Sequence, residues 1–457
     1  MKIKKSYIYL IFLPVFFNQV INLLNNIEFL NVRLDNIISL VSTFLFFSFL
    51  YTVGKTIKDT FSFSTTSFSI IFYLFSFFIV DSIVLFFTKT FLFSEIFLLV
   101  NTIWIFTILY KSKKVLLTVF PFIIYFLLNI YNNFYFNTFS KNENLLGDVE
   151  AIFFPHTKAI YDSSYYFSMT NPAASGYPQF LSYIDALLFK LSFNGEFYTY
   201  MIQASNVFIF LTFLFFFEVR FSTLSKFLSS LLFLSLVSNS EWLKFLFSNS
   251  LMSERIVSFT FAVLLYSLFQ KSNSNIKFLE FFLFGMLIFS KQFTSTVALI
   301  ILILMIGSFK YRRYILIGFI PLAMRELGFL TYFSELEKDH HIRQIDVKDT
   351  IVDLLLFRDL DFSNIYKIFK NLFIDKPLFY LIIVILFLIL INIKNQYYKK
   401  LDFQIYLFSL LLNIILILLL YISAWKNMEL ESPIRYILNM LHLKIVVVFL
   451  LVDRFKQ

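Results

Sequence analysis

Long apolar runs recur from one end of the chain to the other, separated by short segments that carry Lys, Arg and Asn. Examples are IYLIFLPVFFNQVINLL near the start, VALIILILMIGSF in the second half and LFYLIIVILFLILINI near the end. Each run approaches the roughly 20 residues that an α-helix needs to cross about 30 Å of hydrocarbon. The pattern predicts an all-α polytopic membrane protein.

The same pattern places about fourteen transmembrane helices along the chain. The predicted spans cover residues 7–24, 36–54, 69–88, 92–110, 114–131, 199–218, 223–238, 256–270, 278–290, 293–308, 312–328, 377–393, 403–423 and 436–452. The opening MKIKK resembles the basic start of a signal peptide, but no small-residue cleavage site follows it. Because the apolar segment behind it is long enough to span, we expect a retained first helix.

Basic residues gather in alternate connections, and this alternation orients the predicted spans. Lys and Arg concentrate in short cytoplasmic loops of membrane proteins. The connections assigned to the inner side hold Lys2, Lys4, Lys5, Lys55, Lys58, Lys111, Lys113, Lys114, Arg220, Lys226, Lys271, Lys277, Lys310, Arg312, Arg313, Lys394, Lys399, Lys400, Arg454 and Lys456. The intervening short loops hold mostly single basic residues. We therefore expect both termini in the cytoplasm, in what we take to be a bacterial inner membrane.

Composition supports the prediction of a membrane protein and excludes several kinds of functional site. Hydrophobic residues make up 59% of the chain, including 68 Phe, and charged residues only 15%. Soluble domains are closer to a quarter charged. The absence of Cys excludes a disulfide framework, a thiolate nucleophile and a Cys-based metal site. The net charge of +10 is explained by the inner loops, so we expect a bilayer and no nucleic acid as partner.

Two long connections, 132–198 and 329–376, fall on the predicted outer side. Loops of this length are usually functional or disordered, and their many aromatic residues argue against disorder. The first contains YPQFLSYIDALLFKLSF, which we interpret as an amphipathic helix in the outer interface, and 351–373 is expected to contain another. The predicted organisation is a four-helix extension and a membrane core with the first loop, followed by the second loop and the C-terminal spans: 1–113, 114–328, 329–376 and 377–457.

The stretch NLLGDVEAIFFPHTKAIY follows an apolar helix on the outer side and concentrates titratable groups: Asp148, Glu150, His156 and Lys158. The two carboxylates would share a side in an extended segment, whereas on a helix Glu150 and Lys158 would share a stripe. Ordinary surface charge on a solvated loop is the plain alternative. Acidic groups where a loop meets the bilayer are costly unless they serve a function, which favours a site.

Four further residues lie at predicted outer ends. Tyr177, followed by Pro178, suits the start of an interfacial helix. Glu254 begins a helix after a predicted outer loop, where an acid beside Arg255 is often structural. Lys291 is either a snorkelling anchor or a cation aimed into a site, and Arg435 lies at the outer start of the last span. Each signal is weak alone, but together they gather charge on one side of the membrane.

The order of these pieces resembles the GT-C superfamily of polyprenyl-phosphate-sugar-dependent glycosyltransferases, in particular bacterial relatives of protein mannosyltransferases and aminoarabinose transferases. The matching order is an acidic outer loop, a YP helix, a helix with an acidic start, a G…SK break and a C-terminal RY. It covers about 114–308, with a weaker match at 432–445. The four helices before residue 113 have no counterpart in the family's minimal core.

The resemblance implies a GT-C-like helix bundle that moves a sugar from a polyprenyl-phosphate donor to a lipid, glycan or protein acceptor, in cell-envelope glycan biosynthesis. It makes Asp148, or Glu150 in its place, the catalytic carboxylate, with Glu254 as the later acidic residue. Lys158, Tyr177 and Lys291 take the matching substrate-side positions, and we add Arg435 and His156 as binding candidates. Some members use a divalent metal such as Mg²⁺ or Mn²⁺ and others do not; Asp148 and Glu150 are the candidate ligands here.

The chemistry agrees with this assignment. A carboxylate takes the proton of the acceptor hydroxyl as general base, and Lys or Arg stabilises the departing phosphate. A single displacement inverts the anomeric centre and needs no nucleophilic residue.

Two other functions remain open. A transporter of lipid-linked saccharides should carry charges along its spans, and the middle of the predicted spans is nearly free of them. An O-antigen-type polymerase or ligase would rely on arginines and a histidine in a large outer loop. Residues of this type lie in or beside 329–376: Arg325, His340, His341, Arg343 and Arg358. The adjacent pair of histidines does not make a metal site, because two neighbours cannot face one ion from a regular element.

Overall fold

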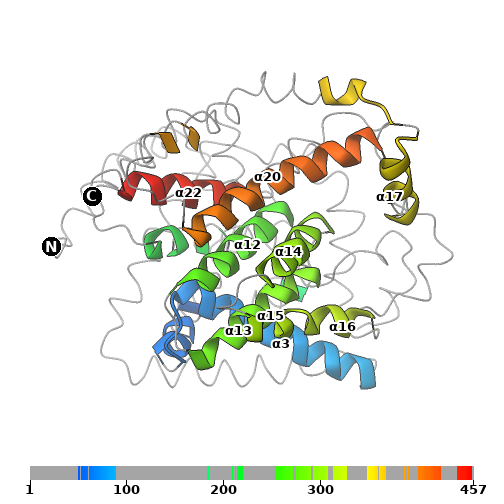
Figure 1. Ribbon diagram of the computed structural model, residues 1–457. Helices are drawn as coiled ribbons and strands as arrows, with labels where there is room; N and C mark the ends of the chain where they lie inside the picture. Colours follow the sequence, from blue (N-terminus) through cyan, green and yellow to red (C-terminus); the bar gives the residue numbers. More distant parts are fainter. Residues whose placement is uncertain are drawn as a thin grey trace, which may run out of the picture. The chain divides into compact units, whose positions relative to one another are not determined.

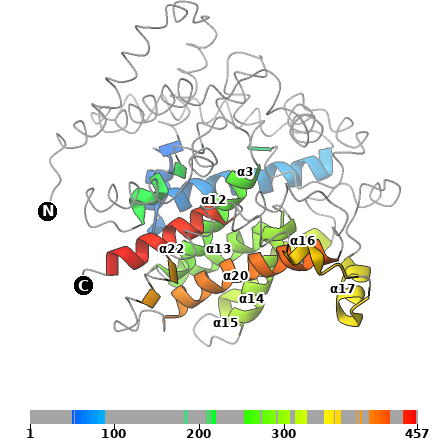
Figure 2. The same ribbon diagram turned by 90° about the horizontal axis from the view of Figure 1, so that it is seen from above.

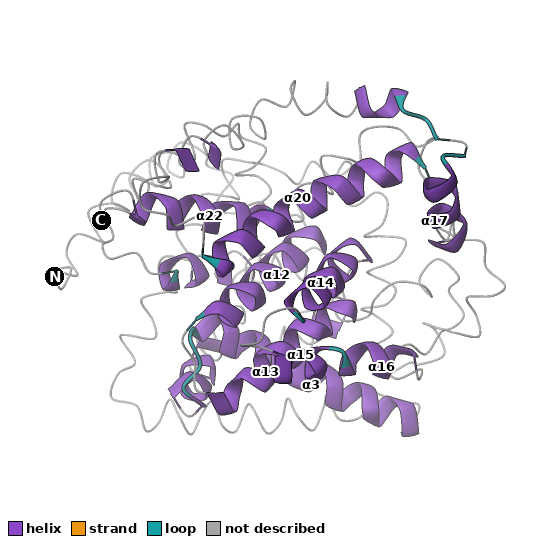
Figure 3. Cartoon of the chain, in the orientation of Figure 1, coloured by secondary structure: helices purple, strands orange, loops and turns teal. Residues whose placement is uncertain are grey.

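The computed structural model describes residues 50–51, 53–59, 61–88, 183–184, 208, 211–212, 214–219, 253–270, 274–289, 292–306, 312–326, 347–358, 360–366, 385–386, 389–390, 400–423 and 440–454. Within these ranges every regular element is a helix, as Figure 3 shows. The all-α fold predicted from the sequence is therefore confirmed for these residues, and the number of spans stays a prediction.

The chain divides into two compact units. The first comprises Met1–Glu218, Lys244–Met252 and Leu327–Phe333, and the second comprises Val219–Leu243, Ser253–Glu326 and Ser334–Gln457. In the first unit the main described element is α3 (Thr66–Thr88), preceded by a helical stretch at 53–59. Phe63 lies between these two pieces, with its ring 4.9 Å from that of Phe68 and 5.4 Å from that of Phe72.

The second unit holds the other helices. They are α12 (Ser253–Phe269), α13 (Ser274–Gly285), the 3₁₀ turn η3 (Met286–Phe289), α14 (Gln292–Met305), α15 (Arg312–Gly318), α16 (Ile320–Glu326), α17 (Val347–Leu356), α20 (Leu401–Ile422) and α22 (Leu441–Arg454). The helix α12 packs against α13 and α22, while α20 packs against α14 and α22 (Figures 1 and 2). The contacts of α12 with α22 position the candidate site described below.

Most described helices coincide with predicted spans, although several are shorter. Among the described residues, a single helix, α20, is long and apolar enough to cross a membrane. Shorter apolar helices occupy Thr66–Val80, Arg255–Phe269, Thr296–Met305 and Leu441–Leu451. The apolar runs therefore located most of the described helices, and α20 alone among them meets the length and composition needed to span.

The span expected as one helix at 312–328 is instead two short helices, α15 and α16, which meet at Phe319. Pro321 explains the break, because proline has no N–H to donate to the carbonyl of Ile317 and its ring crowds that turn. The amide of Phe319 instead bonds the Leu316 carbonyl at 3.2 Å, which tightens the end of α15. The prediction of an unbroken helix here was wrong.

Two glycines bring α13 and α15 into backbone contact. A Cβ atom placed on Gly285 would overlap the carbonyl oxygen of Gly318. A Cβ on Gly318 would first meet the flexible tip of Leu302, at 2.9 Å. Small residues allow this approach between helix backbones, and the chain places two of its 8 glycines at this crossing.

Gly285→Ala should therefore destabilise the protein by about 1–3 kcal/mol or more, because the added methyl group meets backbone that cannot rotate away. Thermal unfolding of the detergent-solubilised protein measures the effect. Gly318→Ala is the matched control at the same crossing, and its loss should be smaller because a leucine side chain yields more easily. Equal melting temperatures for Gly285→Ala and the wild type would show that the two backbones do not touch.

Candidate functional site

Of the predicted site residues, Glu254 alone lies among the described residues, in the first turn of α12. The others fall outside the described residues: Asp148, Glu150, His156, Lys158, Tyr177, Lys291 and Arg435. The convergence of these side chains around one outer cavity therefore stays a prediction, and so does the metal role of Asp148 and Glu150. Within the described ranges, no group of three or more His, Asp or Glu could hold a metal ion.

A buried basic cluster follows Glu254 and is the main polar feature between α12 and α22. It consists of Arg255 on α12 and His442 on α22, with exposed fractions of 1% and 0%. Arg255 is close enough to His442 for their charges to interact. Burying charged groups is costly unless they are paired and hydrogen-bonded. Two buried bases so close together therefore indicate that this place has a specific role.

Ser258 joins the two helices at this cluster. Its hydroxyl oxygen accepts a hydrogen bond from the backbone N–H of His442 at 3.1 Å and lies 2.9 Å from Nδ1 of the same histidine. That N–H belongs to the first turn of α22, where a helix has no internal acceptor for it. Ser258 also shares a face of α12 with Arg255, because the two are three residues apart. The serine thus holds the histidine ring beside the arginine.

The ring of Phe259 closes one side of His442. The two ring centroids are 5.8 Å apart with an interplanar angle of 76°, an edge-to-face contact. Aromatic packing of this kind fixes the orientation of the imidazole and excludes water from it. Two residues of α12, Ser258 and Phe259, therefore fix the orientation of the His442 ring.

His442 and Lys444 were not predicted as site residues from the sequence. Both lie inside the predicted span 436–452, which was taken as one more apolar run. The signal was present, since ionisable residues within a membrane span are rare and mark functional places. The expectation that the middle of the spans is nearly free of charge is thus corrected for this span.

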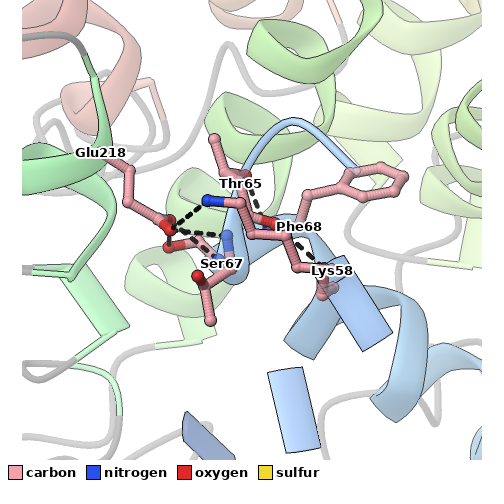
Figure 4. A network of polar contacts seen from close by, with 7 residues as sticks. Lys58, Thr65, Ser67, Phe68 and Glu218 are labelled. Carbon is pink, nitrogen blue, oxygen red and sulfur yellow. Dashed lines mark hydrogen bonds and ion pairs between the residues drawn. The ribbon is translucent and has the colours of Figure 1, made fainter. Parts of the chain in front are cut away.

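Two other charged clusters serve the ends of helices. In the first unit, the Glu218 carboxylate accepts hydrogen bonds from the backbone N–H groups of Thr66 (2.5 Å) and Ser67 (2.9 Å) and from the Ser67 hydroxyl (2.7 Å), as Figure 4 shows. Lys58 lies 3.7 Å from the same carboxylate. Glu218 thus satisfies free amides in the first turn of α3 and places a negative charge at the positive end of the helix dipole.

In the second unit, Lys277 caps the end of α12. Its ammonium group donates to the carbonyls of Leu268 at 2.8 Å and Gln270 at 3.0 Å, and it pairs with Glu280 at 2.5 Å. The hydroxyl of Ser267 donates to the other oxygen of Glu280 at 3.1 Å. Both charges are buried and have hydrogen-bonding partners. The Lys277–Glu280 pair therefore serves to join α12 to α13.

Ser258→Ala should lower the free energy of unfolding by about 1–3 kcal/mol, because a buried N–H of α22 and the His442 ring both lose their partner. Thermal unfolding in detergent measures the loss. Thr260→Val is a matched control on the same helix: the Thr260 hydroxyl is buried and makes no hydrogen bond. The control should be neutral or stabilising. A Ser258→Ala variant as stable as this control would contradict a structural link through the hydroxyl.

Comparison of the chain with known protein families, with functionally characterised proteins and with solved structures found no match. The functional assignment rests on the residues and contacts described above.

Proposed function

We propose that the protein is an inverting glycosyltransferase of a bacterial inner membrane, which moves a sugar from a polyprenyl-phosphate donor to an acceptor at the outer face. The observation that carries the proposal is the buried pair of bases Arg255 and His442, and Arg255 directly follows Glu254 in the sequence. Transfer from a lipid phosphate requires both a carboxylate and bases. The carboxylate takes up the proton of the acceptor, and the bases bind and stabilise the phosphate of the donor.

The contacts between helices support the sidedness on which this proposal depends. Ser258 and His442 join two predicted spans, 256–270 and 436–452, that both begin on the predicted outer side. Asn364, in the predicted outer loop 329–376, donates its side-chain N–H to the carbonyl of Tyr421 at 2.9 Å. Tyr421 belongs to the end of α20 that the charge pattern assigns to the outer side. The lysine joint between α12 and α13 likewise connects two ends predicted to be cytoplasmic.

In the proposed mechanism, Asp148 is the general base that takes the proton of the acceptor hydroxyl, and Glu150 and Glu254 complete the acidic side. Charge grows on the donor phosphate as the bond to the anomeric carbon breaks. Preorganised cations aimed at that charge stabilise the transition state more than the ground state. We assign this task to Lys158, Lys291 and Arg435.

The basic cluster adds Arg255 to these cations. Its planar guanidinium matches two phosphate oxygens at once, and it directly follows Glu254 in the chain. His442 lies beside Arg255 on α22 and is fully buried.

A transporter of lipid-linked saccharides is the second candidate, because His442 and Lys444 lie within a predicted span. Charges that line a path across the bilayer are typical of transporters. Glu254 and Arg255 favour the transferase, because they directly precede the predicted outer start of the span 256–270.

A donor-consumption assay separates the candidates. The purified protein is reconstituted in proteoliposomes with a panel of labelled polyprenyl-phosphate sugars and an extract of envelope lipids, glycans and proteins. A transferase releases polyprenyl phosphate and leaves the label on an acceptor. A transporter moves the intact donor between leaflets, and a polymerase or ligase consumes only diphosphate-linked saccharides. Movement of intact donor without consumption would refute the transferase.

A further inference from the structure

The segment 347–366 exposes large apolar side chains outside any predicted span. The exposed fractions of Leu355, Phe357, Phe362 and Tyr366 are 73%, 78%, 54% and 71%. Leu355 lies in the last turn of α17, which Figure 1 labels, and the other three residues follow this helix in the second predicted outer loop. Single exposed apolar residues are ordinary, but a group of this size marks a surface that contacts a membrane or another molecule.

Phe357 is held in a conformation that phenylalanine rarely adopts. Its φ is +52°, in the left-handed region, directly after the last residue of α17. The amide of Arg358 bonds the carbonyl of Asp353 at 2.9 Å, which completes a helix-ending motif that usually has glycine in the left-handed position. A left-handed residue with a side chain costs about 1–2 kcal/mol. The exposed ring recovers none of this by packing inside the protein.

The segment is fixed at the end of the described helix that is long enough to span. The amide of Asp361 bonds the carbonyl of Ile422 at 2.9 Å, and the Asn364 side chain bonds that of Tyr421 at 2.9 Å. These two carbonyls belong to the last turn of α20, where the helix has no donors of its own for them. The exposed apolar residues therefore lie at the level where a spanning helix leaves the hydrocarbon.

We infer that residues 355–366 form a lipid contact surface, with Phe357 inserted into the outer leaflet beside α20. Aromatic rings are enriched at this depth of a bilayer, where a membrane-surface segment buries its apolar side. Arg358 is exposed next to Phe357 and suits the phosphates of the head groups. Lipid contact explains why a strained phenylalanine occupies a glycine position. The surface holds the second outer loop at the depth of lipid head groups, whatever reaction the protein catalyses.

The absence of Cys from the chain permits a direct test. Phe357→Cys is labelled with an environment-sensitive fluorophore in the full-length protein, reconstituted in phosphatidylcholine–phosphatidylglycerol vesicles. Ser363→Cys, at an exposed polar position of the same segment, is the control. Quenching by a lipid with a spin label high on the acyl chain, relative to quenching by aqueous iodide, should be greater at 357 than at 363. An equal ratio at both positions, or protection of 357 from both quenchers by protein, would overturn the inference.

Phe357→Gly separates lipid contact from a purely structural role. Glycine relieves the left-handed strain, so thermal stability in detergent should be unchanged or higher. In vesicles, the lipid quenching of a label at Phe362→Cys should fall when the Phe357 anchor is removed. Unchanged lipid quenching at this label would contradict the insertion of the Phe357 ring into the outer leaflet. Neither experiment uses sugar transfer, so their failure would leave the proposed function untouched.

Discussion

Asp148→Asn should lower the rate of sugar transfer by about 10²–10⁴-fold, the usual contribution of a general base. Asparagine has nearly the shape of aspartate but does not take a proton at neutral pH. Donor binding should change little, because the assigned phosphate contacts are basic residues elsewhere. The measurement is the rate of polyprenyl phosphate release in proteoliposomes at saturating donor, with KM determined separately.

Asp402→Asn is the matched control, since Asp402 begins α20 at the end that the charge pattern assigns to the cytoplasm. Its transfer rate should equal that of the wild type. If Asp148→Asn also retained full activity, Asp148 would not be the base. If Glu254→Gln were silent as well, the whole acidic site would lie elsewhere and the outer loop 329–376 would become the place to search.

Lys277→Met should cost about 3–5 kcal/mol of folding stability, the usual effect of removing one partner from a buried ion pair. The substitution leaves the fully buried Glu280 carboxylate with its Ser267 contact but without its cation. It also removes the donor to the last carbonyls of α12. Unfolding by a denaturing detergent, followed by the loss of helical circular dichroism, measures the effect.

Two controls sharpen this prediction. Lys277→Met combined with Glu280→Gln should recover some of the loss, because no unpaired charge remains buried. Lys58→Met removes the 3.7 Å contact with Glu218, in which the lysine side chain is 34% exposed, and it should cost less than about 1 kcal/mol. Equal losses from Lys58→Met and Lys277→Met would mean that burial does not determine the strength of these pairs.

The sequence predicted the helices well because their apolar runs are local signals. The run at 403–423 gave α20 within two residues of its observed start, and 256–270 gave most of α12. The break between α15 and α16 was not predicted, because hydropathy does not distinguish one helix from two. Pro321 is the residue in the sequence that indicates it. The backbone contact of Gly285 with Gly318 was beyond any local pattern, since it depends on how two helices cross.

The candidate site was only partly predictable. Glu254 was found because it stands at the edge of an apolar run, where charge is conspicuous. His442 and Lys444 were overlooked because strongly apolar neighbours hid them in a hydropathy average. The approach of His442 to Arg255 depends on the packing of α12 on α22, and Ser258 and His442 are 184 positions apart in the sequence. Pairing over such a distance comes from tertiary structure alone.

The cap that Glu218 supplies to α3 has a consequence for biosynthesis. The carboxylate and the Thr66 amide that it accepts from are 152 positions apart in the sequence. At about 5–20 residues per second, the ribosome makes the cap roughly 8–30 s after the start of the helix. During that interval the first turn of α3 is a nascent helix end whose amides depend on water or on the insertion machinery. The cap of α3 therefore forms only after residue 218 has been made, and completion of the first unit waits longer still, for Leu327–Phe333.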